Sequence, residues 1–280
     1  MWSIRLATPP AAVTVGEGIS AGARYWRETL ELWILPVVAV GIIGGAATWL
    51  LGSVAMDQAT ISNDIRERGD IVAVLLLVLP QILVLTAVTT IVAVLASWVF
   101  IAIAISGLRG RPLTAGWIVG AGLRTLVAGI IQIAAVLTAF GLAILVTDPL
   151  APIVFLVLIV PAIYLSLRLT FWQYAIFDGA GIAAGLRMTW AITRSAVLRI
   201  AGWGLAIAGL GLLVRIGTGL ATALLRDDLA PVAAGISALA DGAFSAFQVI
   251  VVAILYESQR MRHLPQPPPA PAPPTTLQAS

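Results

Sequence analysis

Few residues in this chain have the chemistry that catalysis or metal binding requires. The sequence has no cysteine, and its only histidine, His263, stands at the edge of a proline-rich tail. The 13 acidic residues are scattered, with no Ser-His-Asp set, no His/Asp/Glu cluster and no phosphate-binding glycine loop. We therefore expect no enzyme, no metal site and no cofactor.

Two ionisable residues stand well inside apolar runs, where a charge is costly and usually has a partner. Arg215 lies 13 residues before Asp228, and Asp241 lies 13 residues after it. In an antiparallel helical hairpin that turns at Asp228, both would reach the same depth, so we expect an intramembrane ion pair. The alternatives are that each snorkels separately to the surface or that both face a wet cavity.

The composition indicates which solvent surrounds these residues. Hydrophobic residues make up 60% of the 280-residue chain and charged residues 10%, with a mean hydropathy of +1.03. A soluble domain is nearer 45–50% apolar, so the surplus apolar surface must face lipid. The pI near 9.9 resembles that of a nucleic-acid-binding protein, but the positions of the arginines indicate membrane orientation instead, and we expect no nucleic-acid partner.

The apolar runs predict an all-α integral membrane protein with six transmembrane helices and short cytoplasmic interfacial helices. About 20 apolar residues suffice to cross a bilayer. The expected spans are Leu32–Val54, Ile71–Ser106, Leu126–Val146, Ala151–Thr170, Ile200–Leu225 and Leu229–Leu255. The second is too long for one simple crossing and too short for two, so we expect one long helix that tilts or projects, with Pro80 as its kink or start.

The arginines orient these spans, because basic residues in short loops stay cytoplasmic. With the N-terminus inside, twelve of the fifteen extramembrane arginines are cytoplasmic. They are Arg5, Arg24, Arg27, Arg109, Arg111, Arg124, Arg168, Arg187, Arg194, Arg199, Arg260 and Arg262, against Arg66, Arg68 and Arg226 outside. We therefore expect both termini in the cytoplasm of a cell-membrane protein.

The ends of the chain are expected to differ from the membrane domain, residues 1–262. The first 30 residues lack a compact apolar core with a small-residue cleavage site, so no signal peptide is expected. Residues 263–280 are rich in proline and alanine and are expected to form a disordered cytoplasmic tail. A proline-rich ligand for a partner protein is the alternative role of this tail.

Three cytoplasmic stretches resemble one another, at residues 19–26, 113–117 and 182–190. Each pairs aliphatic and aromatic residues, the first and third with arginine, before a long apolar run, a pattern typical of a helix in the headgroup layer. The chain is then three units, each an interfacial helix plus a transmembrane hairpin, although abundant alanine and glycine make such matches frequent. In the third stretch we expect Ile182, Leu186 and Trp190 to face lipid. Arg187 and Arg194 are expected to meet anionic headgroups.

Glycine spacing adds a packing hypothesis. Gly116–Gly120 and Gly181–Gly185 have GxxxG spacing, and Gly41, Gly44 and Gly45 cluster in the first span. Small residues let helices approach closely in lipid. A dimer face is the functional interpretation, and packing within the monomer is the one we favour.

Arg168 and Glu257 stand near the inner ends of their spans. A long side chain in such a place can reach the interface while its stem stays in lipid. We expect both to snorkel in this way.

The last 115 residues or so carry a more specific pattern. Arg168 precedes Asp178-Gly179, which is followed by Gly185-Leu186-Arg187-Met188-Thr189-Trp190, then Arg194, and finally Leu255-Tyr256-Glu257-Ser258-Gln259-Arg260-Met261-Arg262. This pattern resembles the membrane-domain family named after glycerophosphoryl diester phosphodiesterases. Met188, Thr189 and Ser195 stand where that family has arginine, serine and glycine. The phosphodiesterase of that family is a separate soluble domain, so the resemblance implies a membrane module of unknown activity, with no catalytic domain.

Three function classes compete. The leading one is a non-catalytic membrane module that binds or organises partner proteins or lipid, with anionic headgroups on the cytoplasmic side and a protein partner or a second copy as further partners. The second is a small transporter or lipid translocator with a polar path of Arg215, Asp241, Thr86, Thr89, Thr90, Gln81 and Gln132. The third, an enzyme, would require acids from different spans to converge at one interface.

Overall fold

The computed structural model consists of helices joined by short turns in its described part, which comprises residues 14–68, 71–144, 163–225 and 229–263. Side chains are described at 14–47, 49–50, 83–84, 86–131, 163–225 and 229–263. Within these ranges the secondary structure contains no strand. The helices are α1 (Val15–Glu28), α2 (Leu30–Arg68), α3 (Ile71–Arg109), α4 (Ala115–Ile144), α6 (Trp172–Phe177), α7 (Ile182–Thr193), α8 (Val197–Ala223) and α9 (Ala230–His263), and residues 163–169 are also helical.

Four helical segments of the described residues are long and apolar enough to cross a membrane. They are Leu30–Ala47, Thr86–Arg109, Val197–Ala223 and Ala230–His263, and they lie in α2, α3, α8 and α9. They are compatible with a membrane protein. The expected third span falls mostly on α4, and the end of the expected fourth span falls on the helical residues 163–169. The rest of these two spans lies within residues 145–162, which are outside the described part. Their crossing therefore stays a prediction.

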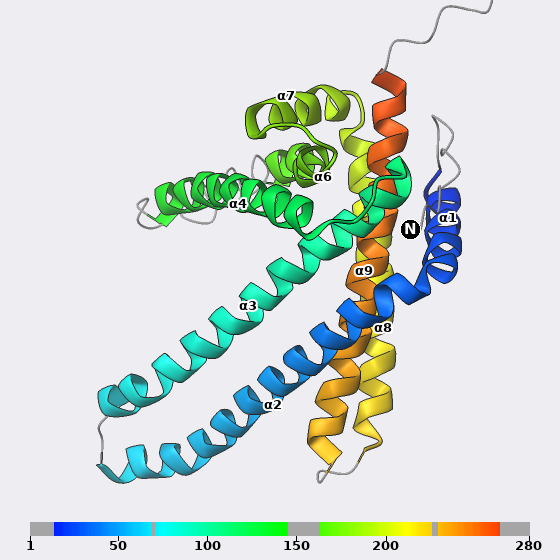
Figure 1. Ribbon diagram of the computed structural model, residues 1–280. Coiled ribbons are helices and arrows are strands. Elements are labelled where there is room, and N and C mark those ends of the chain that lie inside the picture. The colour runs from blue at the N-terminus through cyan, green and yellow to red at the C-terminus, as the bar shows by residue number, and fades with distance from the viewer. Residues whose placement is uncertain (1–13, 69–70, 145–162, 226–228, 264–280) are drawn as a thin grey trace, which may run out of the picture.

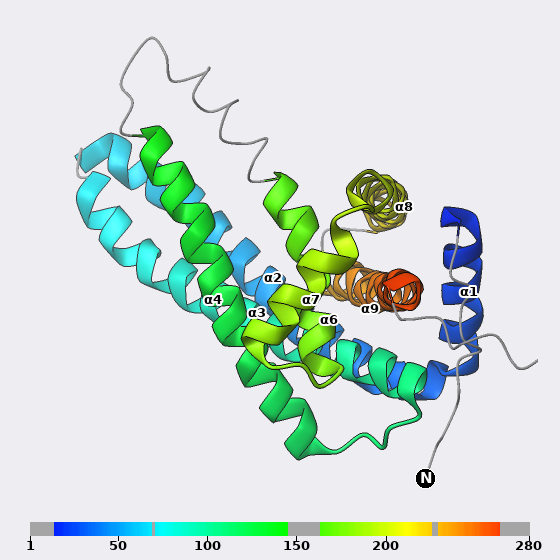
Figure 2. The same cartoon turned by 90° about the horizontal axis from the view of Figure 1, so that it is seen from above.

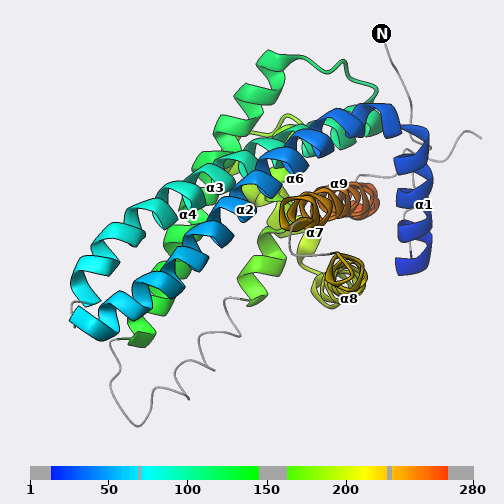
Figure 3. The same ribbon diagram turned by 90° about the horizontal axis from the view of Figure 1, so that it is seen from below.

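Helix α9 is the central element of the molecule. It contacts α1, α2, α3, α7 and α8, and Figure 1 shows α8 alongside it over most of its length. Its residues Ala246, Ile250 and Ile254, spaced four apart on one face, are each at most 1% exposed. Helices α2 and α3 form a second antiparallel pair that crosses the first obliquely, and Figure 3 shows them side by side with α8 and α9 seen end-on.

Glycine permits the close approach of α2 to α9. A Cβ atom on Gly41 would lie 2.3 Å from Leu239 Cδ2, and one on Gly45 would lie 2.9 Å from Gly235 Cα. Both separations are shorter than side chains tolerate, so these glycines serve packing within the monomer, the interpretation favoured from the sequence. By contrast, a Cβ on Gly116 or Gly181 would meet nothing within 4 Å, and a dimer face there stays a prediction.

The short helices cross the long ones. Figure 2 shows α8 and α9 end-on and α1 side-on, so α1 lies across that pair. Helix α7 also runs across α9, near the C-terminal end of α9 (Figure 1). Thr14 and Glu17 start α1 with a capping box, in which Thr14 N–H donates to Glu17 Oε2 at 2.8 Å.

Two of the three similar stretches form short helices and one does not. Residues 19–26 lie in α1 and residues 182–190 in α7, whereas residues 113–117 lead into α4 and form no helix of their own. The third of these stretches is followed by a break between α7 and α8, and the first by a break between α1 and α2, whereas α4 runs without a break from Ala115 to Ile144. The second expected interfacial helix is therefore absent from its predicted place. Helix α3 is one long helix from Ile71, as its composition predicts, and the tail at 264–280 lies outside the described residues.

Candidate functional site

A double salt bridge joins the C-terminal end of α3 to two other elements. Arg109, the last residue of α3, donates from Nε and Nη2 to Asp178 Oδ1 and Oδ2, both at 2.7 Å. Its Nη1 and Nη2 donate to Glu257 Oε1 and Oε2 at 2.8 and 2.7 Å. One planar guanidinium thus binds two carboxylates in bidentate fashion, the geometry for which arginine is suited and lysine is not.

Two more residues of α9 complete this cluster. The Tyr256 hydroxyl donates to Asp178 Oδ2 at 3.1 Å. Arg260 lies 3.6 Å from Asp178 Oδ2 and 3.5 Å from Glu257 Oε2. We call these five residues, Arg109, Asp178, Tyr256, Glu257 and Arg260, the Arg109 network. It contains two carboxylates and two guanidinium groups, so its formal charges cancel.

Burial makes the network energetically important. The side chains of Asp178 and Glu257 are only 8% and 4% exposed, and that of Arg109 is 17% exposed. Charges removed from water to this extent need partners with good geometry, because the desolvation cost is large. Glu257 does not snorkel, contrary to the sequence-based expectation, because Arg109 and Arg260 hold its carboxylate inside the protein.

Two glycines shape the turns from which the network projects. Gly110, directly after Arg109, has φ +62°, and Gly179, directly after Asp178, has φ +108°. These are the described residues with positive φ, a region that side chains other than glycine rarely adopt. The second turn lets Arg111 Nη1 donate to the Asp178 carbonyl at 3.1 Å. The Asp-Gly pair of the sequence pattern therefore has a conformational reason.

Buried tyrosines from the short helices brace the same region. Tyr174 of α6 donates its hydroxyl to the Val249 carbonyl of α9 at 3.3 Å, and burial raises the pKa of Tyr174 far above its ordinary value. Burial likewise raises the pKa of Tyr25, on α1, to about 12. The Tyr25 hydroxyl lies 3.5 Å from the Ile103 carbonyl of α3. Both hydroxyls therefore stay protonated donors at neutral pH and fix α1 and α6 to the long helices.

The site contains acids from different elements, yet their surroundings favour a structural role. An enzyme would require such convergence, and Asp178 and Glu257 meet that condition. Arg109 occupies both oxygens of each carboxylate, however, and Arg260 and Tyr256 add further contacts. A general base needs a lone pair directed at its substrate, whereas these lone pairs are directed at neighbouring side chains.

A second cluster surrounds Arg168, which is 5% exposed. Its Nη1 donates to the Trp190 carbonyl at 2.9 Å and to Thr193 Oγ1 at 3.3 Å. Its guanidinium carbon lies 4.2 Å from the Trp190 ring centroid and 5.4 Å from that of Tyr164. Nε has no hydrogen-bond partner, and no described carboxylate forms a salt bridge with Arg168. The expectation that Arg168 snorkels is therefore wrong, because two aromatic rings and a helix-end carbonyl hold it inside.

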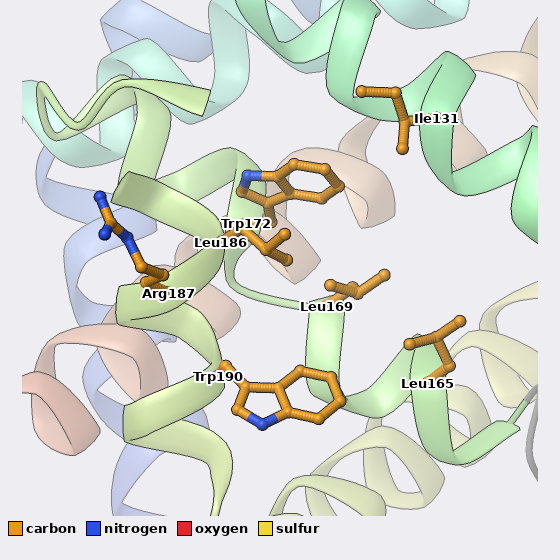
Figure 4. Close-up of a pocket in the computed structure, with 7 residues that line it drawn as sticks. All are labelled: Ile131, Leu165, Leu169, Trp172, Leu186, Arg187 and Trp190. Atoms are coloured by element: carbon orange, nitrogen blue, oxygen red, sulfur yellow. The ribbon is translucent and has the colours of Figure 1, made fainter. Parts of the chain in front are cut away.

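A pocket of about 450 Å³ lies beside this cluster. Figure 4 shows its lining, which we call the α7 pocket: Ile131, Leu165, Leu169, Trp172, Leu186, Arg187 and Trp190. Arg187 is the one charged member, and its guanidinium points away from the cavity centre (Figure 4). Trp172 donates from Nε1 to the Ile182 carbonyl at 2.9 Å, which fixes α6 against the start of α7.

The remaining pattern residues are distributed around these clusters. Arg194 is the exposed C-cap of α7, and Arg262 is exposed near the end of α9. Of the ten residues singled out by the family-like pattern, the structure thus brings Asp178, Gly179, Tyr256, Glu257 and Arg260 together in or beside the Arg109 network. Arg168, Arg187 and Trp190 meet at or beside the α7 pocket.

Arg215 and Asp241 lie apart from both clusters, on α8 and α9. Arg215 Nε is 3.3 Å from Asp241 Oδ1, so the two side chains have the proximity that the hairpin spacing predicts. Their side chains are 73% and 51% exposed on the protein surface. Asp241 also lines a cavity of about 350 Å³ between α2, α3 and α9, whose other polar side chains are Thr89, Ser237 and Ser245.

The rest of the expected polar path does not gather there. Thr90 Oγ1 donates to the Thr86 carbonyl of its own helix at 2.7 Å, and neither Thr86 nor Thr90 lines this cavity. The side chains of Gln81 and Gln132 lie outside the described part. The sequence thus anticipated two residues of the cavity, Thr89 and Asp241, but not its serines.

No protein-family model, no curated protein and no solved structure matches the chain. Among the residues whose side chains are described, no group of three or more histidine, aspartate or glutamate residues is placed to hold a metal ion.

Proposed function

We propose that this chain is a non-catalytic multi-pass module of the cell membrane that binds or organises lipid or partner proteins. It belongs, on this proposal, to the membrane-domain family named after glycerophosphoryl diester phosphodiesterases, and it has no catalytic domain. The observation that carries the proposal is the Arg109 network, which commits the acids of the family-like pattern to holding helices together. Four apolar helices long enough to span a bilayer support the membrane setting.

The proposed topology has six spans with both termini in the cytoplasm. The Arg109 network then lies at the cytoplasmic ends of α3 and α9, next to the short helices α6 and α7. That arrangement would present a rigid, arginine-rich surface to the cytoplasmic headgroup layer, where each basic residue attracts anionic lipid by ~1 kcal/mol. The arginine distribution along the sequence supports this orientation.

Single cysteines test the topology directly, because the chain contains none. With a membrane-impermeant thiol reagent on intact cells, Ser62→Cys should be labelled. Ser195→Cys should be labelled only after the membrane is opened. The two changes have the same chemistry, so each is the control for the other, and labelling of position 195 but not 62 would contradict the orientation. Thr147→Cys separates six spans from four, since it is labelled in intact cells only if the second hairpin crosses.

A small transporter or lipid translocator is the second candidate, and the cavity around Asp241 favours it. That cavity places a carboxylate and three hydroxyl side chains between apolar helices, and polar groups at membrane depth are typical of transport paths. The pairing of Asp241 with Arg215 favours the first candidate, because it gives the carboxylate a structural partner.

Water in the cavity distinguishes the two candidates. A transport path should let a small charged thiol reagent modify Ser245→Cys quickly, since only a thiolate in water reacts. Ile236→Cys is the control, because Ile236 is 41% exposed on the same helix and does not line the cavity. We expect both positions to react equally slowly, and fast modification confined to position 245 would favour the transporter.

A further inference from the structure

The α7 pocket combines a nearly all-apolar lining with positive charge that no described acid balances. Six of its seven described lining side chains are aliphatic or tryptophan, and no acid is among these seven. Its volume of about 450 Å³ lies within the ~300–1,000 Å³ of small-molecule sites. An apolar cavity with a cation at its edge is complementary to an amphiphile whose polar end is negatively charged.

Arg168 supplies the second and more unusual observation. Its guanidinium stacks on the ring of Trp190, and that ring lines the pocket. The charge is thus one aromatic ring away from the pocket, is 5% exposed, and has no salt bridge to any described acid. A buried charge normally has a counter-ion, and within the described residues the protein provides only π-faces, a carbonyl and a hydroxyl.

The orientation of Arg187 indicates which side of the pocket lies nearer the headgroup layer. Its stem lies at the edge of the cavity while its guanidinium points away from the cavity centre (Figure 4). Arginine in the headgroup layer adopts this arrangement, with its stem on apolar surface and its charge toward phosphate. The apolar floor from Leu165, Leu169 and Leu186 then faces the hydrocarbon side.

We infer that the α7 pocket binds one anionic phospholipid, with an acyl chain in the cavity and the phosphate near Arg187. The field of Arg168 favours the same sign of headgroup. This inference rests on the proposed membrane-module function and names the lipid class and the place where it binds. The occupant is a phospholipid and not a soluble anion, because six of the seven described lining side chains are aliphatic or tryptophan and the Arg187 guanidinium points away from the cavity centre.

The test uses the full chain reconstituted in phosphatidylcholine vesicles that contain a trace of photoreactive lipid. One preparation carries phosphatidylglycerol with a diazirine on its acyl chain, and the other carries phosphatidylcholine with the same group. After irradiation, cross-linked peptides are mapped by mass spectrometry. Photoreactive phosphatidylglycerol should label peptides that contain Leu165–Trp172 and Leu186–Trp190 about fivefold more than photoreactive phosphatidylcholine. A fivefold ratio corresponds to ~1 kcal/mol.

Matched variants locate the two parts of the lipid. Arg187→Gln should lower the labelling ratio of the two lipids toward one, and the remaining preference reports the field of Arg168. Arg194→Gln is the control, because Arg194 is an exposed arginine at the end of the same helix that does not line the pocket, and it should leave the ratio unchanged. Leu186→Trp should fill the cavity and lower the labelling of these peptides by both lipids.

Three results would overturn the inference. Equal labelling by the two lipids would show that the pocket does not prefer an anionic headgroup. Cross-links spread evenly over the exposed apolar faces of α2 and α8 would indicate only the surrounding bilayer. No cross-link at the pocket peptides, with labelling elsewhere, would mean that the chain itself fills the cavity. The cysteine labelling tests the proposed topology and the photolabelling tests the lipid site. The two measurements are independent, so either proposal can fail while the other is supported.

Discussion

Replacing Arg109 with alanine is expected to lower the free energy of unfolding by ~3–5 kcal/mol, the usual effect of removing one partner from a buried ion pair. The variant would leave Asp178 and Glu257 in a site where their side chains are 8% and 4% exposed. Arg260, at 3.5–3.6 Å from both, cannot replace four hydrogen bonds of 2.7–2.8 Å. Thermal unfolding of the purified chain in lipid nanodiscs, followed by tryptophan fluorescence, measures the loss.

Arg111→Ala is the matched control for this prediction. Arg111 lies two residues further along, is exposed, and donates one hydrogen bond to the Asp178 carbonyl at 3.1 Å. Its removal should cost less than ~1.5 kcal/mol, the range of a single net hydrogen bond. Equal losses from Arg109→Ala and Arg111→Ala would show that the network does not hold the helices.

A version of the network without its two acids and Arg109 tests whether charge or shape matters. Arg109→Met combined with Asp178→Asn and Glu257→Gln removes both acids along with the arginine. The charge that remains, Arg260, has a side chain that is 27% exposed and can turn to water. No buried charge is then left without a partner, so this triple variant should be more stable than Arg109→Ala alone. A triple variant that is less stable than the single one would indicate that the ion pairs themselves supply the stabilisation.

The sequence predicted those parts of the fold that depend on local pattern. The run from Ile71 to Ser106 indicated one long helix, and α3 is such a helix. Arg215 and Asp241 could be placed side by side because they belong to consecutive helices, whose turn fixes their relative depth. The glycines of the first span indicated close packing, and Gly41 and Gly45 meet α9.

The Arg109 network could not be predicted in the same way. Its members are 69 and 148 residues apart along the chain, so no periodicity or hairpin register connects them. In the sequence Arg109 resembled the other loop arginines, which were expected only to orient the protein in the membrane. The available signal was indirect, since Asp178 and Glu257 stand on the arginine-rich side and need basic partners, but the sequence offers twelve candidates there. Only the packing of α3 against α9 selects one of them.

The same limit applies to Arg168. Its position near the end of an apolar run is compatible with snorkelling, because a long side chain near the interface usually has water within reach. The competing contact is made by Trp190, 22 residues away on a different helix. Whether α7 folds back over Arg168 depends on tertiary packing, and the sequence pattern alone does not contain that information.

Asp241→Ala is expected to destabilise the chain in a bilayer by ~2.5–3.5 kcal/mol, since it strands Arg215 at membrane depth. The Arg215 and Asp241 side chains are 73% and 51% exposed on the protein surface. In the proposed topology that surface faces lipid, so water does not screen the pair. The double variant Arg215→Ala with Asp241→Ala should be more stable than either single variant, because it leaves no charge without a partner.

A double-mutant cycle in lipid nanodiscs isolates this coupling from the other effects of each change. The wild-type chain, both single variants and the double variant are unfolded thermally under one condition. Ser237→Ala, four residues before Asp241 and in the same cavity, is the control for a small polar deletion and should change stability by less than ~1 kcal/mol. Additive losses from the two single variants would mean that Arg215 and Asp241 act independently. Asp241 would then act as a polar group of the cavity between α2, α3 and α9 and not as the partner of Arg215. The transporter would become the better account of this protein.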